Sequence, residues 1–94
     1  MPQFVKAGDT SKYIAKLKNF AGVLADPVSV TFNVYNHTTR SIITTGAATK
    51  ESTGVYYYYY TAPTDLTGCV VFEFVGVLDG YPIIARDLLI IEWP

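Results

Sequence analysis

Cysteine, histidine and charge are all scarce in this chain of 94 residues. It contains one cysteine and one histidine, and charged residues make up 16% of it, where about 25% is typical. The lone cysteine, Cys69, excludes an internal disulfide and any metal site built from several cysteines. The low charged fraction indicates that a partner covers part of the surface.

A basic excess, which nucleic-acid binding requires, is also missing. Seven Lys and Arg stand against eight Asp and Glu, a formal net charge of −1, so little attracts a phosphate backbone. The first residues lack the apolar core of a signal peptide, and no run reaches the roughly 18 apolar residues of a membrane helix. We expect no nucleic-acid or membrane partner, and a protein kept in a cytosol-like space or leaving it without a cleaved signal.

Groups for catalysis or metal binding are not gathered anywhere in the sequence. His37 lies in a polar turn with no recognisable partner nearby, and a turn histidine is usually solvated. Cys69 begins an apolar segment, where we expect a buried and inert thiol. No calcium-loop or phosphate-loop spacing occurs. We therefore expect a protein that is not an enzyme, with no catalytic residue, metal site or cofactor.

Apolar residues are abundant, at half of the chain, and they recur with period two between short turn segments. This pattern predicts a single all-β domain over residues 1–94, with about seven strands. The strands are expected at residues 3–7, 11–18, 28–35, 41–45, 54–61, 69–78 and 81–93. Residues 46–53 are expected to form a loop. Asp79-Gly80 predicts a two-residue type I′ hairpin.

The clearest alternation predicts which side chains form the core. Those expected to face inward from residues 28–35 are Val28, Val30, Phe32 and Val34. Those expected to share one face of residues 11–18 are Tyr13, Ala15 and Leu17.

The last two predicted strands are apolar on both faces, although a sandwich strand usually has one polar face. The apolar residues of the second faces include Val71, Val75, Val77, Leu88 and Ile90. Exposing them would create a larger apolar patch than monomers normally tolerate. Burying several hundred Å² contributes several kcal/mol at about 25 cal/mol per Å², before the costs of association. The alternatives are a bulge near Arg86-Asp87 that shifts the register, or cover by a neighbouring part of the chain.

Five tyrosines follow one another from Tyr56 to Tyr60. In a strand, Tyr56, Tyr58 and Tyr60 share one face and Tyr57 and Tyr59 share the other, so at least two tyrosines lie outside whichever face is buried. Tyrosine is enriched at protein interfaces. The alternatives are simple strand propensity and a platform on which sugars stack.

Several landmarks together resemble the small immunoglobulin-like domains of bacteriophage virion proteins. They are the segments Lys6-Ala7-Gly8-Asp9-Thr10, Asp26-Pro27-Val28-Ser29-Val30-Thr31-Phe32 and Gly54-Val55-Tyr56-Tyr57-Tyr58, together with Gly68, the Asp79-Gly80 turn and the closing apolar strand. The resemblance implies an immunoglobulin-like antiparallel β-sandwich in a head decoration, neck, tail or baseplate. It also implies many symmetric copies in a virion that assembles in the host cytoplasm.

Gly54-x-Tyr56 also looks like the tyrosine-corner region of immunoglobulin domains, which implies that Tyr56, Tyr58 and Tyr60 point inward. The paired cysteines and central tryptophan of antibody domains are absent, which argues against an antibody-type module.

These observations predict a structural subunit that contacts itself and other virion proteins. The residues expected to form the contacts are Tyr57, Tyr59, Val71, Val75, Val77, Leu88, Ile90 and Trp93. One alternative is a carbohydrate-binding or cell-surface adhesion module that uses exposed tyrosines. Another is an accessory domain of an enzyme.

Overall fold

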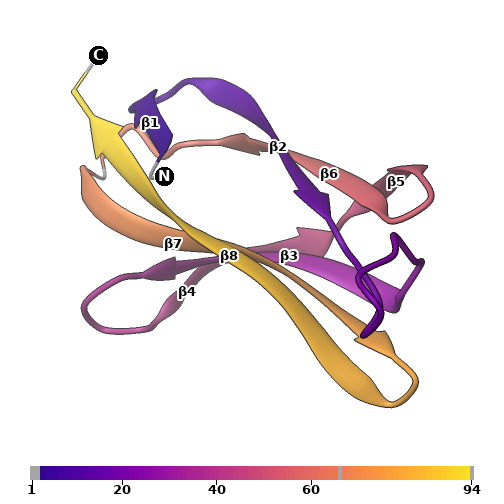
Figure 1. The fold of residues 1–94 in the computed structure, drawn as a ribbon. Helices are drawn as coiled ribbons and strands as arrows, with labels where there is room; N and C mark the ends of the chain where they lie inside the picture. The colour runs from indigo at the N-terminus through magenta and orange to yellow at the C-terminus, as the bar shows by residue number, and fades with distance from the viewer. Residues whose placement is uncertain (1–2, 66, 94) are drawn as a thin grey trace.

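The computed structural model describes residues 3–65 and 67–93, which form two β-sheets packed face to face (Figure 1). One sheet has five strands in the order β1-β8-β7-β3-β4, and the other has three in the order β2-β6-β5. The strands are β1 (Gln3–Lys6), β2 (Thr10–Lys16), β3 (Val28–Asn36), β4 (Ile42–Ala47), β5 (Thr49–Ser52), β6 (Val55–Thr61), β7 (Gly68–Leu78) and β8 (Tyr81–Glu92). The prediction of an all-β chain is confirmed, with two packed sheets, but the expected antiparallel pairing is wrong for β1, which pairs with β8 in parallel. Nothing in the described ranges forms a helix that could cross a bilayer.

The described residues contain eight strands where seven were expected, because β5 lies inside the predicted loop. All four residues of β5 are exposed, so no apolar alternation marks it in the sequence. Pairing with β6 makes it a strand, with Lys50 opposite Tyr56. Pairing with a neighbouring strand therefore determines that these residues form a strand, and their own sequence does not.

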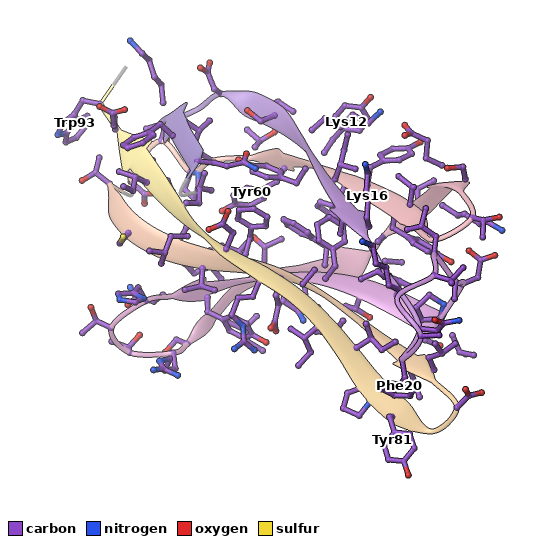
Figure 2. The ribbon with its side chains drawn as sticks, viewed as in Figure 1. Lys12, Lys16, Phe20, Tyr60, Tyr81 and Trp93 are labelled. Carbon is purple, nitrogen blue, oxygen red and sulfur yellow. The ribbon has the colours of Figure 1, made fainter. Side chains whose placement is uncertain are left out.

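The core lies between the sheets and is rich in aromatic rings. Phe32 of β3 is fully buried, and the ring of Tyr58 from β6 stacks on it at 4.5 Å. Figure 2 shows Tyr60 between the two layers, where it contacts Tyr13 of β2 at a ring distance of 6.2 Å. The inward orientation of Tyr56, with Tyr58 and Tyr60, is confirmed. The expected shared face of residues 11–18 is confirmed too, since Tyr13 and Ala15 of β2 and Leu17 just after it are all buried.

The tyrosine-corner region itself differs from the expected pattern. The Tyr56 hydroxyl lies 3.5 Å from Oδ1 of Asp26, which precedes it by 30 residues in the chain. In immunoglobulin domains the corner tyrosine bonds to backbone a few residues away.

Val28 was expected to face the core, and this expectation is wrong. Its side chain is 67% exposed because Ser29 adopts a left-handed conformation with φ of 55°. The register of β3 against β7 shifts between Val28 and Thr31, so the alternation restarts beyond the irregularity. Val30, Phe32 and Val34 are buried as expected.

The hairpin of β7 and β8 keeps one register along its whole length. Asp79 and Gly80 both have positive φ, 53° and 81°, as a type I′ turn requires. Pairing continues without interruption from Leu78 opposite Tyr81 to Gly68 opposite Ile91. The alternative of a bulge near Arg86-Asp87 is therefore wrong, and the second faces of both strands lie together on the outside of the sandwich.

Candidate functional site

The outward face of the five-stranded sheet, called the outer face below, is apolar at both ends and polar across its middle. Strand pairing arranges its side chains in rows. The apolar residues between the middle and the end of β8 are Phe4, Val71, Leu88 and Ile90. Those between the middle and the Asp79-Gly80 turn are Val28, Val75, Val77 and Ile84. Val71, Val75, Leu88 and Ile90 are half-buried by their neighbours, and the remaining four are exposed.

The middle row is organised around one acidic side chain, Glu73 of β7, which is only 2% exposed. Arg86 lies opposite on β8 and donates to Oε2 from Nε at 3.1 Å and from Nη2 at 2.8 Å. Asn33 of β3 donates to Oε1 at 3.3 Å, and the Tyr35 hydroxyl donates to the same oxygen. Thr45 of β4 then donates to Oδ1 of Asn33 at 2.7 Å. These five side chains, the Glu73 cluster, span four strands and satisfy one another.

The pKa of Glu73 reflects opposing effects. Burial raises it, while hydrogen bonds from Tyr35, Arg86 and Asn33 and the charge of Arg86 lower it, and the result lies below the usual range. The pKa of Tyr35 is raised, first because its hydroxyl donates to Glu73 and then because it is desolvated. The carboxylate therefore stays charged at neutral pH, and it holds Arg86 and Tyr35 in place.

A groove of about 510 Å³ opens beside the Glu73 cluster. Val71 and Leu88 supply its apolar part, and polar groups come from the strands and from the turn between β3 and β4. Its lining residues are Tyr35, His37, Arg40, Val71, Arg86, Asp87 and Leu88. This volume lies in the range of sites that bind small molecules or single side chains. The groove is therefore the strongest candidate for specific recognition on the described surface.

The eight residues expected to form contacts lie on three separate surfaces. Val71, Val75, Val77, Leu88 and Ile90 share the outer face. Tyr57 and Tyr59 lie on the three-stranded sheet, where their rings meet edge to face at 5.6 Å. Trp93 follows the end of β8 and is 70% exposed. One flat contact cannot include them all.

The prediction that Cys69 is buried is wrong, because its thiol is free and exposed. Cys69 lies opposite Ile90 near the start of β7, and its position in the alternation places it on the outer face. Neighbouring valines in the sequence gave no indication of which face it would take.

Sequence reasoning missed two features that depend on contacts between distant segments. One is the Glu73 cluster, in which Glu73 appeared only as a single polar residue among valines. The other is an apolar end of the sandwich, where Phe20 packs edge to face on Tyr81 at 5.8 Å (Figure 2). Asn19 orders the loop there, since its Oδ1 accepts from the amides of Ala21 and Val23. A signal for the second feature was present, because residues 20–24 are apolar within a turn.

Comparison with known proteins gives no further guide. No protein-family model, curated protein or solved structure matches the chain.

Proposed function

We propose that this protein is a non-enzymatic structural subunit that assembles with copies of itself and with other proteins of a virion. The outer face carries this proposal. It combines exposed and half-buried apolar rows with a polar cluster whose groups are already hydrogen bonded to one another. Burying such a face removes apolar surface from water and leaves few polar groups of the cluster without partners.

The order of the strands supports an immunoglobulin-like identity for the sandwich. In immunoglobulin domains strands B, E and D share one sheet, and variable-type domains add C′ to the sheet of G, F and C. The order β2-β6-β5 corresponds to B-E-D, and β8-β7-β3-β4 corresponds to G-F-C-C′. The phage virion, assembled in the host cytoplasm, is the setting that the sequence landmarks imply. It is part of the same proposal.

Sedimentation velocity over a range of concentrations tests the proposal. We expect the wild type to self-associate, and we expect Ile84→Glu to weaken association by about tenfold or more because it charges the outer face. Ile14→Glu is the matched control. Ile14 lies on the three-stranded sheet and is 50% exposed, against 49% for Ile84.

A wild type that stays monomeric at every concentration would contradict self-assembly. Equal weakening by both variants would show that the outer face is not the contact surface.

The geometry of the tyrosine pair argues against the carbohydrate alternative. Nζ of Lys12 lies 4.6 Å from the ring centroid of Tyr57, so that ring face is occupied. Tyr59 is 61% exposed, so it is the one ring of this pair that is open to a ligand. A carbohydrate-binding module would need a platform of exposed rings on which sugars stack. Glycan-array binding by a monomeric wild type, lost in Tyr59→Ala, would favour the alternative.

A further inference from the structure

Two of the residues that line the groove, Arg86 and Tyr35, are held in place by Glu73 before any ligand arrives. Glu73 holds the guanidinium of Arg86 through two hydrogen bonds, yet the side chain of Arg86 remains 55% exposed. A guanidinium held in one plane offers its face for stacking at little further cost in entropy. The hydroxyl of Tyr35 is held by the same carboxylate. The groove is therefore preorganised for a flat, electron-rich ring.

The second cation in the groove, Arg40, extends this preference. It belongs to the turn between β3 and β4, where its φ of 63° gives the turn its shape. An aromatic ring beside two arginines gains cation–π attraction, which is strongest for the indole of tryptophan. A carboxylate next to that ring would face Arg40. Arg40 and Arg86 outnumber Asp87, the one acid among the lining residues, so the groove fits an aromatic side chain with an acidic neighbour.

This chain presents such a pair at Glu92 and Trp93. Both side chains are exposed, and Trp93 is the only tryptophan of the chain. In Figure 2 Trp93 projects beyond the end of β8, away from both sheets. Tyr81, which follows Asp79-Gly80, is the other exposed aromatic close to an acid, but its ring already packs on Phe20. Trp93 makes no ring contact with the other described residues.

Trp93 cannot enter the groove of its own protomer. Leu88 of the groove lies on the same strand, and five residues of β-strand separate the two by about 16 Å. Pairing of Glu92 with Lys6 of β1 keeps that end of β8 in place.

We propose that the groove of one copy binds Trp93 of a second copy, with Glu92 of that copy beside Arg40. This inference rests on the proposed self-assembly and specifies one part of its contact, at the end of the outer face that holds Val71 and Leu88. The two halves of the contact are different surfaces, so copies join head to tail, and the smallest closed form is a pair in which each copy places its Trp93 in the groove of the other.

The single tryptophan makes the contact measurable, because all indole emission comes from Trp93. On self-association we expect the emission to shift to the blue and to become shielded from acrylamide. Arg40→Glu should remove both changes, and Trp93→Ala should weaken association by about 30-fold or more, as for an interface hot spot. Tyr81→Ala is the matched control and should associate as the wild type does.

Mixing two defective variants gives the decisive result. Trp93→Ala keeps the groove and has no indole, whereas Arg40→Glu keeps the indole and has a damaged groove. At a concentration where the wild type has just assembled, each variant alone should remain monomeric, and a mixture should form a one-to-one complex whose emission shifts to the blue.

Assembly of the wild type with water-exposed Trp93 emission would overturn this inference and leave the proposed function standing. A monomeric wild type with exposed emission would overturn both. A mixture that forms no complex would exclude the head-to-tail contact.

Discussion

Glu73 is the most unusual residue of the described surface, since it is a charged side chain almost fully buried on the outside of a sheet. A buried carboxylate is tolerated only when hydrogen bonds and an opposite charge replace its hydration. Arg86, Asn33 and Tyr35 provide both. Each partner lies on an adjacent strand, so the carboxylate joins β3, β7 and β8 at one point.

The lowered pKa of Glu73 predicts acid sensitivity. Its folded-state pKa lies below the ordinary 4.5, so the Glu73 carboxylate binds a proton more readily in the unfolded chain than in the folded protein. The charged cluster therefore stabilises the fold at pH values above 4.5. This stability is lost as pH falls through the folded-state pKa. We expect Glu73→Gln to lower the free energy of unfolding by about 2 kcal/mol at pH 7. The gap from the wild type should narrow below about pH 4.5.

Urea unfolding of both proteins at several pH values measures this gap. Glu51→Gln, which removes an exposed pair with Lys12, is the control and should change stability little. A gap that stays constant down to pH 3 would contradict the assignment of the titrating group.

Three tyrosine hydroxyls provide a second prediction at the same scale. The hydroxyls of Tyr13 and Tyr60 are buried and make no hydrogen bond of good geometry among the described residues, where Ser11 and Thr44 are their neighbouring polar groups. That of Tyr35 bonds to Glu73. We expect Tyr13→Phe and Tyr60→Phe to leave stability unchanged or to raise it by up to about 1 kcal/mol. Tyr35→Phe should cost about 2 kcal/mol because it removes a bond to a charged group. Thermal or urea unfolding ranks the three, and the reverse order would contradict the hydrogen-bond assignment.

At the scale of the strands, the sequence predicted what local patterns control. Alternation identified the buried faces of β2 and most of β3, and the Asp79-Gly80 turn fixed the long hairpin. The alternation pattern gave wrong predictions where a distant strand or an unusual backbone conformation determined the structure. The positive φ of Ser29 turned Val28 outward, and β5 exists only because β6 lies beside it.

Gly54 shows how a turn between elements is enforced. It has a φ of 72°, and a Cβ there would lie 2.8 Å from the carbonyl oxygen of Leu17 and 2.9 Å from the amide nitrogen of Ala25. Gly54→Ala must therefore displace backbone as well as accept a left-handed conformation, and we expect it to cost about 3 kcal/mol or more. Gly22 has a similar φ of 82° with no atom within 4 Å of such a Cβ, so Gly22→Ala should cost only about 1–2 kcal/mol. Equal losses in urea unfolding would exclude the backbone clash.

At the scale of the whole molecule, the candidate site could be predicted only in part. Apolar second faces in residues 69–92 indicated a covered surface, and five of the expected contact residues do share the outer face. The groove could not be foreseen, because Tyr35 and Arg40 reach Arg86 and Leu88 only through the pairing of β3 with β7 and of β7 with β8. Residues this far apart in the sequence are not related by the period of a strand, so no local pattern predicts that they meet.

A head-to-tail contact also determines how assemblies grow. Each copy has one Trp93 and one groove, so copies close into a ring, of which a reciprocal pair is the smallest, or continue as a filament. A copy with Trp93→Ala accepts a neighbour in its groove and offers nothing to the next one. Adding it to the wild type in rising proportion should therefore reduce the mean size of the assemblies in sedimentation velocity, because each such copy ends a chain or breaks a ring. Adding Tyr81→Ala in the same proportions should leave the size unchanged. A symmetric dimer that uses the same surface on both copies would respond differently, because it contains two copies and cannot be shortened further. A mean size that stays constant when Trp93→Ala is added would exclude growth through this contact.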